Sequence, residues 1–159
     1  LYTDDVVVDH ERLFHLNDRD FSWHRVEDLK GLIIGGTLHT VYPVFEQAEQ
    51  KGILKIERAG TYENLFRRLL GRRIDAVPQV SAVGSFLVRT RLSAEQQAMI
   101  SVHPTIIQTR HYALILSKAV PENRRFLKLF NKGLAIIRNN GTYDLLKDRL
   151  SRGGYDHRD

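Results

Sequence analysis

Short apolar runs alternate along this chain with longer stretches in which apolar residues recur every three or four positions. The short runs predict strands, because they are rich in β-branched residues and most are bounded by glycine or proline; they are Val6–Val8, Leu32–Ile34, Ile53–Ile56, Ile74–Val77 and Thr105–Ser117. The longer stretches have the period of amphipathic helices; they cover residues 40–52, 61–70, 81–91, 121–139 and 142–150. A further turn is expected over residues 93–99.

This alternation predicts an α/β fold with a mainly parallel sheet flanked by helices. Ligands of such sheets bind outside the carboxyl ends of the strands, often at helix N-termini. Pro78 is expected to end its strand, and Asp75 to have a structural role, either in an ion pair with Arg72 or Arg73 or as a loop cap. Three threonines stand where they can cap the helices that follow them: Thr40, Thr61 and Thr142.

Composition places the chain among ordinary soluble globular proteins. Hydrophobic residues make up 42% of its 159 residues and charged residues 27%, and a chain of this length can bury a core. No apolar run approaches the roughly 18 residues of a membrane-spanning helix. No secretion signal starts at Leu1, so an exported protein would already have lost its signal.

A formal net charge of +5 raises the question of an acidic partner such as nucleic acid. The positive charges are spread out, however, and no RNA-binding or zinc-finger motif accompanies them. The densest cluster falls in and just after a predicted helix, where a solvated surface is the expected arrangement: Arg67, Arg68, Arg72 and Arg73. We therefore expect no nucleic-acid partner.

No motif for catalysis, metal binding or a cofactor is present. The chain has no cysteine, which excludes disulfides, thiolate metal sites and cysteine nucleophiles. Two pairs of its seven histidines are close in sequence, but neither pair has the i, i+4 spacing of helical metal ligands: His10 with His15, and His103 with His111. A nucleophile elbow, a phosphate-binding loop and an H-E-x-x-H motif are all missing. We expect a binding protein and not an enzyme.

Three motifs together resemble one protein family. The segment Asp28–Gly31 is followed by the strand Ile33–Gly35, Gly71–Val77 forms a second motif, and Phe130–Leu134 with Asn140–Asp144 forms the third. Their order and separations are similar to those of bacterial solute-binding proteins of the amino-acid ABC-transporter type. The resemblance extends over about residues 4–150.

The resemblance implies the type II periplasmic-binding fold, in which two α/β lobes are joined by two crossing segments and enclose the ligand. Residues 1–110 would form the second lobe with the first hinge crossing. Residues 111–159 would form the return strand and the C-terminal helices that dock on the first lobe. Most of the first lobe, including the arginine that grips a ligand carboxylate in the family, would be missing.

The resemblance also implies where a ligand binds. Family members bind the ligand carboxylate with the backbone N–H groups and a hydroxyl of a turn that corresponds to His39, Thr40 and Val41. Thr40 preserves the hydroxyl, and Tyr42 follows with a ring that can stack on a ligand. The structural alternatives are that Thr40 is only a helix cap, His39 a surface imidazole and Tyr42 a packing residue.

A second turn departs from the family pattern. The aspartate that receives the ammonium group of an α-amino acid in the family corresponds to Val80, and Gln79 stands beside it. A valine cannot neutralise an ammonium group, and an unpaired buried charge is costly. Gln79 or Ser81 is therefore expected to hydrogen-bond a neutral or differently arranged ligand, unless Gln79 is only a solvated helix start.

The functional hypothesis is a periplasmic solute-binding component of an ABC transporter. It binds a small polar or anionic, amino-acid-like solute between two lobes and delivers it to a membrane permease. The alternative is a ligand-sensing domain of a regulator or membrane sensor with the same fold, and a dehydratase-like enzyme is a third, less supported reading. Without a first lobe, the return strand and the helix over 121–139 would expose apolar faces, so a homodimer is expected.

Overall fold

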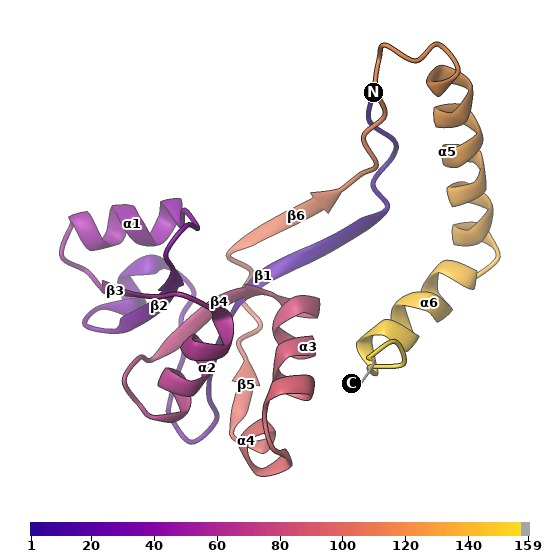
Figure 1. Ribbon diagram of the computed structural model, residues 1–159. Helices are drawn as coiled ribbons and strands as arrows, with labels where there is room; N and C mark the ends of the chain where they lie inside the picture. Colours follow the sequence, from indigo (N-terminus) through magenta and orange to yellow (C-terminus); the bar gives the residue numbers. More distant parts are fainter. Residues whose placement is uncertain (157–159) are drawn as a thin grey trace. The chain divides into compact units, whose positions relative to one another are not determined.

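The computed structural model describes residues 1–156, which form two compact units (Figure 1). The larger unit is residues 10–108, and the smaller unit combines residues 1–9 with the chain from Thr109 onwards. The chain passes between the units twice, within strand β1 (Val7–Leu16) and within strand β6 (Gln108–Tyr112). Residues 157–159, the end of the expected C-terminal segment, lie outside the described part of the chain.

The larger unit is built on a mixed sheet with the strand order β3-β2-β4-β1-β5. Besides β1, its strands are β2 (Ile33–Thr37), β3 (Lys55–Ala59), β4 (Ala76–Val80) and β5 (Ile100–Val102). Strand β2 runs parallel to β3 and β4, whereas β1 is antiparallel to β4 and β5. The prediction of an α/β sheet flanked by helices is confirmed, and the parallel part consists of β3, β2 and β4.

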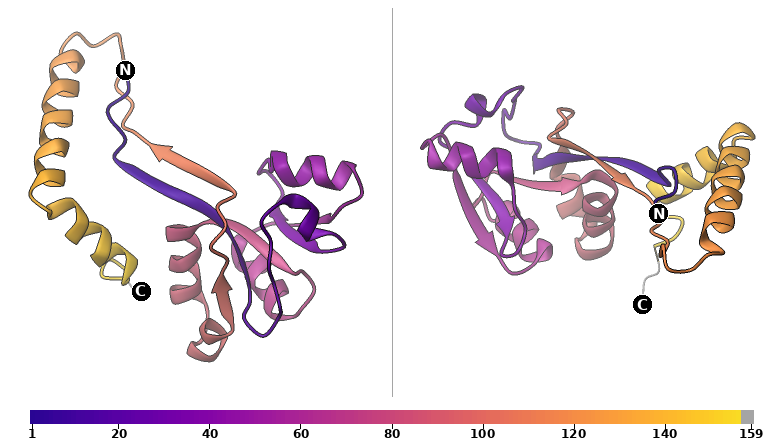
Figure 2. Two further views of the ribbon diagram at one scale, coloured as in Figure 1. Left: turned by 180° about the vertical axis from the view of Figure 1, so that it is seen from behind. Right: turned by 90° about the horizontal axis from the view of Figure 1, so that it is seen from above.

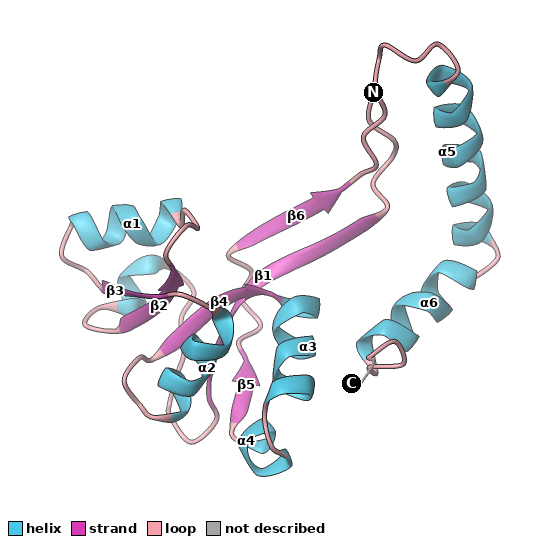
Figure 3. Cartoon of the chain, in the orientation of Figure 1, coloured by secondary structure: helices cyan, strands magenta, loops and turns pink. Residues whose placement is uncertain are grey.

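Helices cover both faces of this sheet (Figure 3). The 3₁₀ turn η1 (Val26–Leu29) and helix α1 (Pro43–Gln50) pack on one face, and α2 (Tyr62–Leu70) and α3 (Ser81–Arg91) on the other, followed by α4 (Ala94–Ala98). Each face has its own hydrophobic cluster, one including Leu13 and Phe45 and the other Phe14 and Phe66. Neighbouring residues of β1 enter different clusters because alternate side chains of a strand face opposite sides.

Strand β5 was not predicted, and β6 covers only Gln108–Tyr112 of the expected residues 105–117. At β1 and β4, in contrast, the strands extend further than predicted. Strand β1 continues to Leu16, well past the predicted Val6–Val8, and His15 within it is only 8% exposed. Pro78 lies inside β4, opposite Leu13 of β1, and does not end the strand. In both places long-range pairing between β1 and β4 extends a strand past residues that disfavour it locally.

The predicted helix caps and ion pair are confirmed only in part. The Thr61 hydroxyl accepts the N–H of Asn64 and caps α2 as expected. The other two caps are wrong, because Tyr42 and Gly141 occupy the capping positions. Asp75 is structural, but its partners are Arg19 and, at 2.7 Å, the N–H of Ile33. The expected partners Arg72 and Arg73 are not bonded to it; Arg72 pairs with Asp18.

The smaller unit contains an extended ladder and two helices, α5 (Asn123–Asn139) and α6 (Thr142–Ser151) (Figure 2). In the ladder, the N–H of Thr3 donates to the carbonyl of Leu114 at 3.1 Å and that of Val6 to Tyr112 at 2.7 Å. Helix α6 is bonded to it through the Tyr143 hydroxyl, which donates to the Val6 carbonyl at 2.8 Å. Among the described residues of this unit, the one buried hydrophobic side chain is Leu134.

A cluster of aromatic rings in the larger unit contains two buried histidines. His15 and His103 are 8% and 7% exposed, with ring centroids 6.0 Å apart. Phe21 stacks on His15 at 4.6 Å, and Trp23 lies 6.0 Å from His103. The N–H of Thr105 donates to Nδ1 of His103 at 3.2 Å, which requires that nitrogen to be unprotonated.

We expect acid to destabilise the protein through His103. Burial, and then the charges of His15 and His24, hold the pKa of His103 below its ordinary value of 6.5. The folded state therefore binds this proton less readily than the unfolded chain, so the stability contributed by neutral His103 is complete above pH 6.5 and is lost as the pH falls below it. Protonation also turns Nδ1 from the acceptor of the Thr105 bond into a donor.

The measurement is thermal unfolding between pH 5 and pH 8 for the wild type and His103→Asn, whose amide oxygen replaces the acceptor without titrating. Protonation of His103 should lower the free energy of unfolding by about 1 kcal/mol, which corresponds to a Tm lower by about 2–4 °C in a chain of this size. The substitution should reduce the acid-induced fall by that amount, whereas the same change at the exposed His24 should have a smaller effect. Identical pH profiles for wild type and His103→Asn would contradict this role.

Candidate functional site

All six predicted ligand residues lie at one edge of the larger unit's sheet, four on the turn after β2 and two at the end of β4. Strands β2, β3 and β4 are parallel, so their carboxyl ends meet at this edge, and each is followed by a helix. Residues 38–42 connect β2 to α1, whereas Gln79 and Val80 are the last residues of β4 and α3 follows directly at Ser81, so that the second turn is the junction of β4 with α3. Because β2 and β4 are adjacent, the two turns are neighbours at the position where α/β sheets bind ligands.

The first turn presents backbone N–H groups at the start of α1. Within the described residues, no hydrogen-bond partner is found for the N–H groups of residues 38–41. His39 and Val41 are exposed, whereas Thr40 is partly buried. The Thr40 hydroxyl accepts a hydrogen bond from Thr37 at 2.5 Å and also interacts with the Tyr62 hydroxyl. Free amides, a nearby hydroxyl and the positive end of a helix dipole together favour an anion.

Tyr42 supports this turn from within the core. Its side chain is only 4% exposed, so its ring offers little surface for stacking on a solute. The hydroxyl accepts the N–H of Thr37 at 3.1 Å and lies 3.3 Å from the hydroxyl of Tyr62. Burial, and then the hydrogen bond with Tyr42, raise the pKa of Tyr62 to about 12, so the Tyr62 phenol remains a neutral hydrogen-bonding group at ordinary pH.

Arg58, at the end of β3, joins both ends of the same turn. Its Nη1 donates to the carbonyl of Thr37 at 2.8 Å and to that of Thr40 at 2.9 Å, and its Nη2 donates to Glu46 of α1 at 2.6 Å. The guanidinium also lies 5.8 Å from the centre of the Tyr42 ring. The sequence analysis missed Arg58, because no local pattern distinguishes it from the other basic residues.

The second turn contains no negative charge. Gln79 is 6% exposed, and its Oε1 accepts the N–H of Val80 at 2.8 Å, so this oxygen is occupied within the turn. The Ser81 hydroxyl donates to the carbonyl of His10 at 2.8 Å, and Nη1 of Arg12 approaches it at 3.5 Å. The segment from Gln79 to Ser81 therefore stabilises the start of α3 and carries no carboxylate for a ligand ammonium group.

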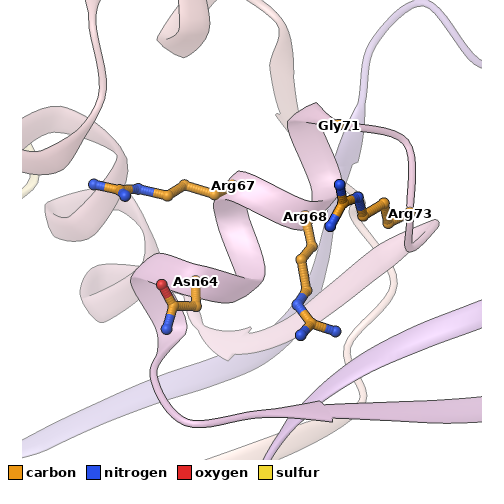
Figure 4. Close-up of a pocket in the computed structure, with 5 residues that line it drawn as sticks. All are labelled: Asn64, Arg67, Arg68, Gly71 and Arg73. Carbon is orange, nitrogen blue, oxygen red and sulfur yellow. The ribbon is translucent and has the colours of Figure 1, made fainter.

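The arginine cluster noted in the sequence is a paired surface and not a second anion site. A surface hollow of about 340 Å³ is lined by Asn64, Arg67, Arg68, Gly71 and Arg73. Arg67 pairs with Glu63 at 2.7 Å and Arg68 with Glu57. The side chains of Arg67 and Arg68 extend in different directions and do not converge on one point (Figure 4).

Neither a metal site nor a membrane-spanning helix is found in the described part of the chain. Residues 1–156 contain no group of three or more histidine, aspartate or glutamate side chains placed to hold a metal ion. Across the same residues, no helix combines the length and the apolar character required to cross a membrane.

Comparison with known proteins gives a structural likeness only. The chain matches no protein-family model and no curated protein. Among solved structures, it is similar to an ancestral arginine-binding protein bound to arginine, with 23% identity and a TM-score of 0.64 over 94% of this chain and 63% of that one.

A substrate-binding protein of an amino-acid ABC transporter from Streptococcus pneumoniae, bound to L-arginine, has 14% identity and a TM-score of 0.68 over 99% of this chain and 63% of that one. The GluR0 ligand-binding core in complex with L-glutamate has 12% identity and a TM-score of 0.68 over 94% and 62%.

These neighbours are binding proteins and not enzymes. One further neighbour, with 20% identity and a TM-score of 0.59 over 94% of this chain and 60% of that one, is an ancestral amino-acid-binding protein described as a precursor of cyclohexadienyl dehydratase. The chain spans 60–63% of the length of these four structures. The family expectation is thus confirmed at the level of architecture: the chain has the type II periplasmic-binding fold of amino-acid substrate-binding proteins, over part of their length.

Proposed function

We propose that this chain is the ligand-binding part of a solute-binding component of an ABC transporter, acting in the periplasm and delivering its solute to a membrane permease. The solute is small, polar or anionic, and amino-acid-like. The observation that carries the proposal is the turn at residues 38–41, where unpaired N–H groups and the Thr40 hydroxyl stand at the start of α1. Neighbours bound to arginine or glutamate support the same ligand class.

In this proposal each predicted residue has a definite role. The amides of residues 38–41 and the Thr40 hydroxyl bind a ligand carboxylate. His39 and Val41 contact the ligand from the exposed rim of the turn, and Tyr42 holds the turn from below. Gln79 and Val80 contact the opposite end of the ligand, where the missing carboxylate weakens recognition of an ammonium group.

The two-lobed arrangement is part of the proposal. Residues 1–110 would act as the second lobe, and residues 111–159 would supply the return strand and the helices that dock on a first lobe. The ligand would be enclosed by hinge motion of the two crossing segments. The chain spans less than two thirds of the length of its structural neighbours.

A ligand-sensing domain is the second candidate. The observations that support it are the absence of a carboxylate between Gln79 and Ser81 and the likeness to the GluR0 ligand-binding core. A permease and an ATPase encoded next to this protein would support transport, whereas a kinase or DNA-binding segment in the same chain would support sensing.

Ligand binding is tested by thermal shift and calorimetry with L-arginine, L-glutamine and L-glutamate as probes. A ligand present at 100 times its Kd stabilises the native state by about 2.7 kcal/mol and raises the Tm measurably. Thr40→Val, which removes the hydroxyl, should weaken binding by about tenfold. The control is Thr90→Val, because the Thr90 hydroxyl bonds only within its own helix. No shift with any probe, extended to a panel of organic acids, would argue against solute binding.

Self-association remains a prediction from the sequence. Many apolar side chains of the smaller unit are exposed, which favours burial against another surface; they include Ile115, Phe126, Leu129, Ile136 and Leu145. We expect a homodimer of this chain in light scattering at high concentration. Ile136→Lys should shift the equilibrium toward monomer, and a wild type that stays monomeric at every concentration would contradict the prediction.

A further inference from the structure

We infer that Arg58 is a positioning residue for the turn at residues 38–41: it fixes the carbonyl groups of the turn on one side and so leaves its N–H groups free for an anionic ligand. The inference deepens the proposed function and rests on it only for the identity of the ligand group. Arg58 comes from β3, whereas the turn connects β2 to α1.

Three hydrogen bonds from one guanidinium group define the arrangement. Nη1 bridges the carbonyls of Thr37 and Thr40, which are three residues apart, at 2.8 and 2.9 Å. Nη2 is bound by Glu46, so the guanidinium is also fixed to α1. Planar geometry makes arginine suited to this task, because its donors point in fixed directions. A lysine ammonium is a point charge and cannot reproduce all three bonds with the same directions.

Occupied carbonyls and unoccupied amides distinguish this turn from an ordinary loop. The carbonyls at both of its ends are bound by Arg58, whereas no partner for the N–H groups of residues 38–41 exists among the described residues. Hydrogen bonds to a charged donor are stronger than neutral ones, so the turn is held in place without using its own amides. Such preorganisation lowers the entropy lost when a ligand binds.

The surroundings of Arg58 also fit this role. Its side chain is 32% exposed and that of Glu46 is 30% exposed, so the pair lies at the edge of the fold and is not required to fill a core. A comparable pair joins Arg68 of α2 to Glu57, the residue of β3 that precedes Arg58. This pair does not reach the turn. That second pair provides a matched control for the loss of an arginine–glutamate interaction.

The test measures backbone hydrogen exchange at single residues by NMR, in the whole chain without added ligand. The unbonded amides of residues 38–41 exchange fast already in the wild type, so the readout is the two bonded amides that flank them: Thr37, which donates to the Tyr42 hydroxyl, and Tyr42, which donates to Glu46.

Arg58→Met should accelerate exchange of these two amides by about tenfold, because the charge-assisted bonds that hold the turn are lost. Arg58→Lys should have an intermediate effect, and Glu46→Gln should leave most of the protection. Arg68→Met should leave both amides unchanged, and β4 should keep its protection in all variants. Unchanged exchange at Thr37 and Tyr42 in Arg58→Met and Arg58→Lys would overturn the inference.

A second arm separates this inference from the proposed function. Affinity for L-arginine, L-glutamine and L-glutamate is measured by calorimetry in the wild type and the same variants. If a probe binds the wild type, Arg58→Met should weaken it by about tenfold or more, and Arg68→Met should not. Faster exchange with no binding of any probe would support Arg58 and count against the function. Normal binding by an Arg58→Met variant with unchanged exchange would count against Arg58 and leave the function standing.

Discussion

The pairing of β4 with β2 on one side and β1 on the other is the interaction on which the larger unit depends. Strand β4 is buried along nearly its whole length, with Ala76 and Val77 fully inaccessible. Its parallel register with β2 brings the two carboxyl ends to one edge, and its antiparallel register with β1 fixes the crossing strand against the same sheet. Both hydrophobic clusters draw residues from β1 and β4, so a shift in this register would disturb both faces together.

The candidate site is a consequence of this arrangement. A turn after β2 has no side chains of its own to hold its shape, apart from the short bond between Thr37 and Thr40. Its conformation is set by two groups that flank it, the buried Tyr42 hydroxyl at its end and Arg58 on the neighbouring strand β3. The positions of functional groups on the turn are thereby fixed by hydrogen bonds to residues of the rigid sheet.

The two units differ in how their stability is supplied. The larger unit encloses two clusters of buried side chains. The smaller unit is held mainly by polar contacts, such as the N–H of Asp4 with the Asn131 side chain at 3.1 Å and Tyr143 with the Val6 carbonyl. Polar contacts at a surface contribute little net free energy, and many apolar residues of α5 and α6 are exposed.

Local periodicity and turn chemistry determined much of this protein from the sequence alone. The spacing of apolar residues predicted the alternation of strands and helices except for α4 and β5, three motifs indicated the fold, and the Thr61 cap followed from neighbouring residues. These features depend on interactions within a few residues, which a sequence displays directly.

Only the tertiary structure decided the features that depend on long-range contacts. Pro78 continues a strand because β1 pairs across it, Asp75 binds Arg19 and not its neighbours, and Tyr42 faces the core. Arg58 acquires its role because the parallel register places β3 beside β2. Hydrogen bonds are short and directional, so which distant residues form them depends on how strands are paired, and residue spacing along the chain does not specify that pairing.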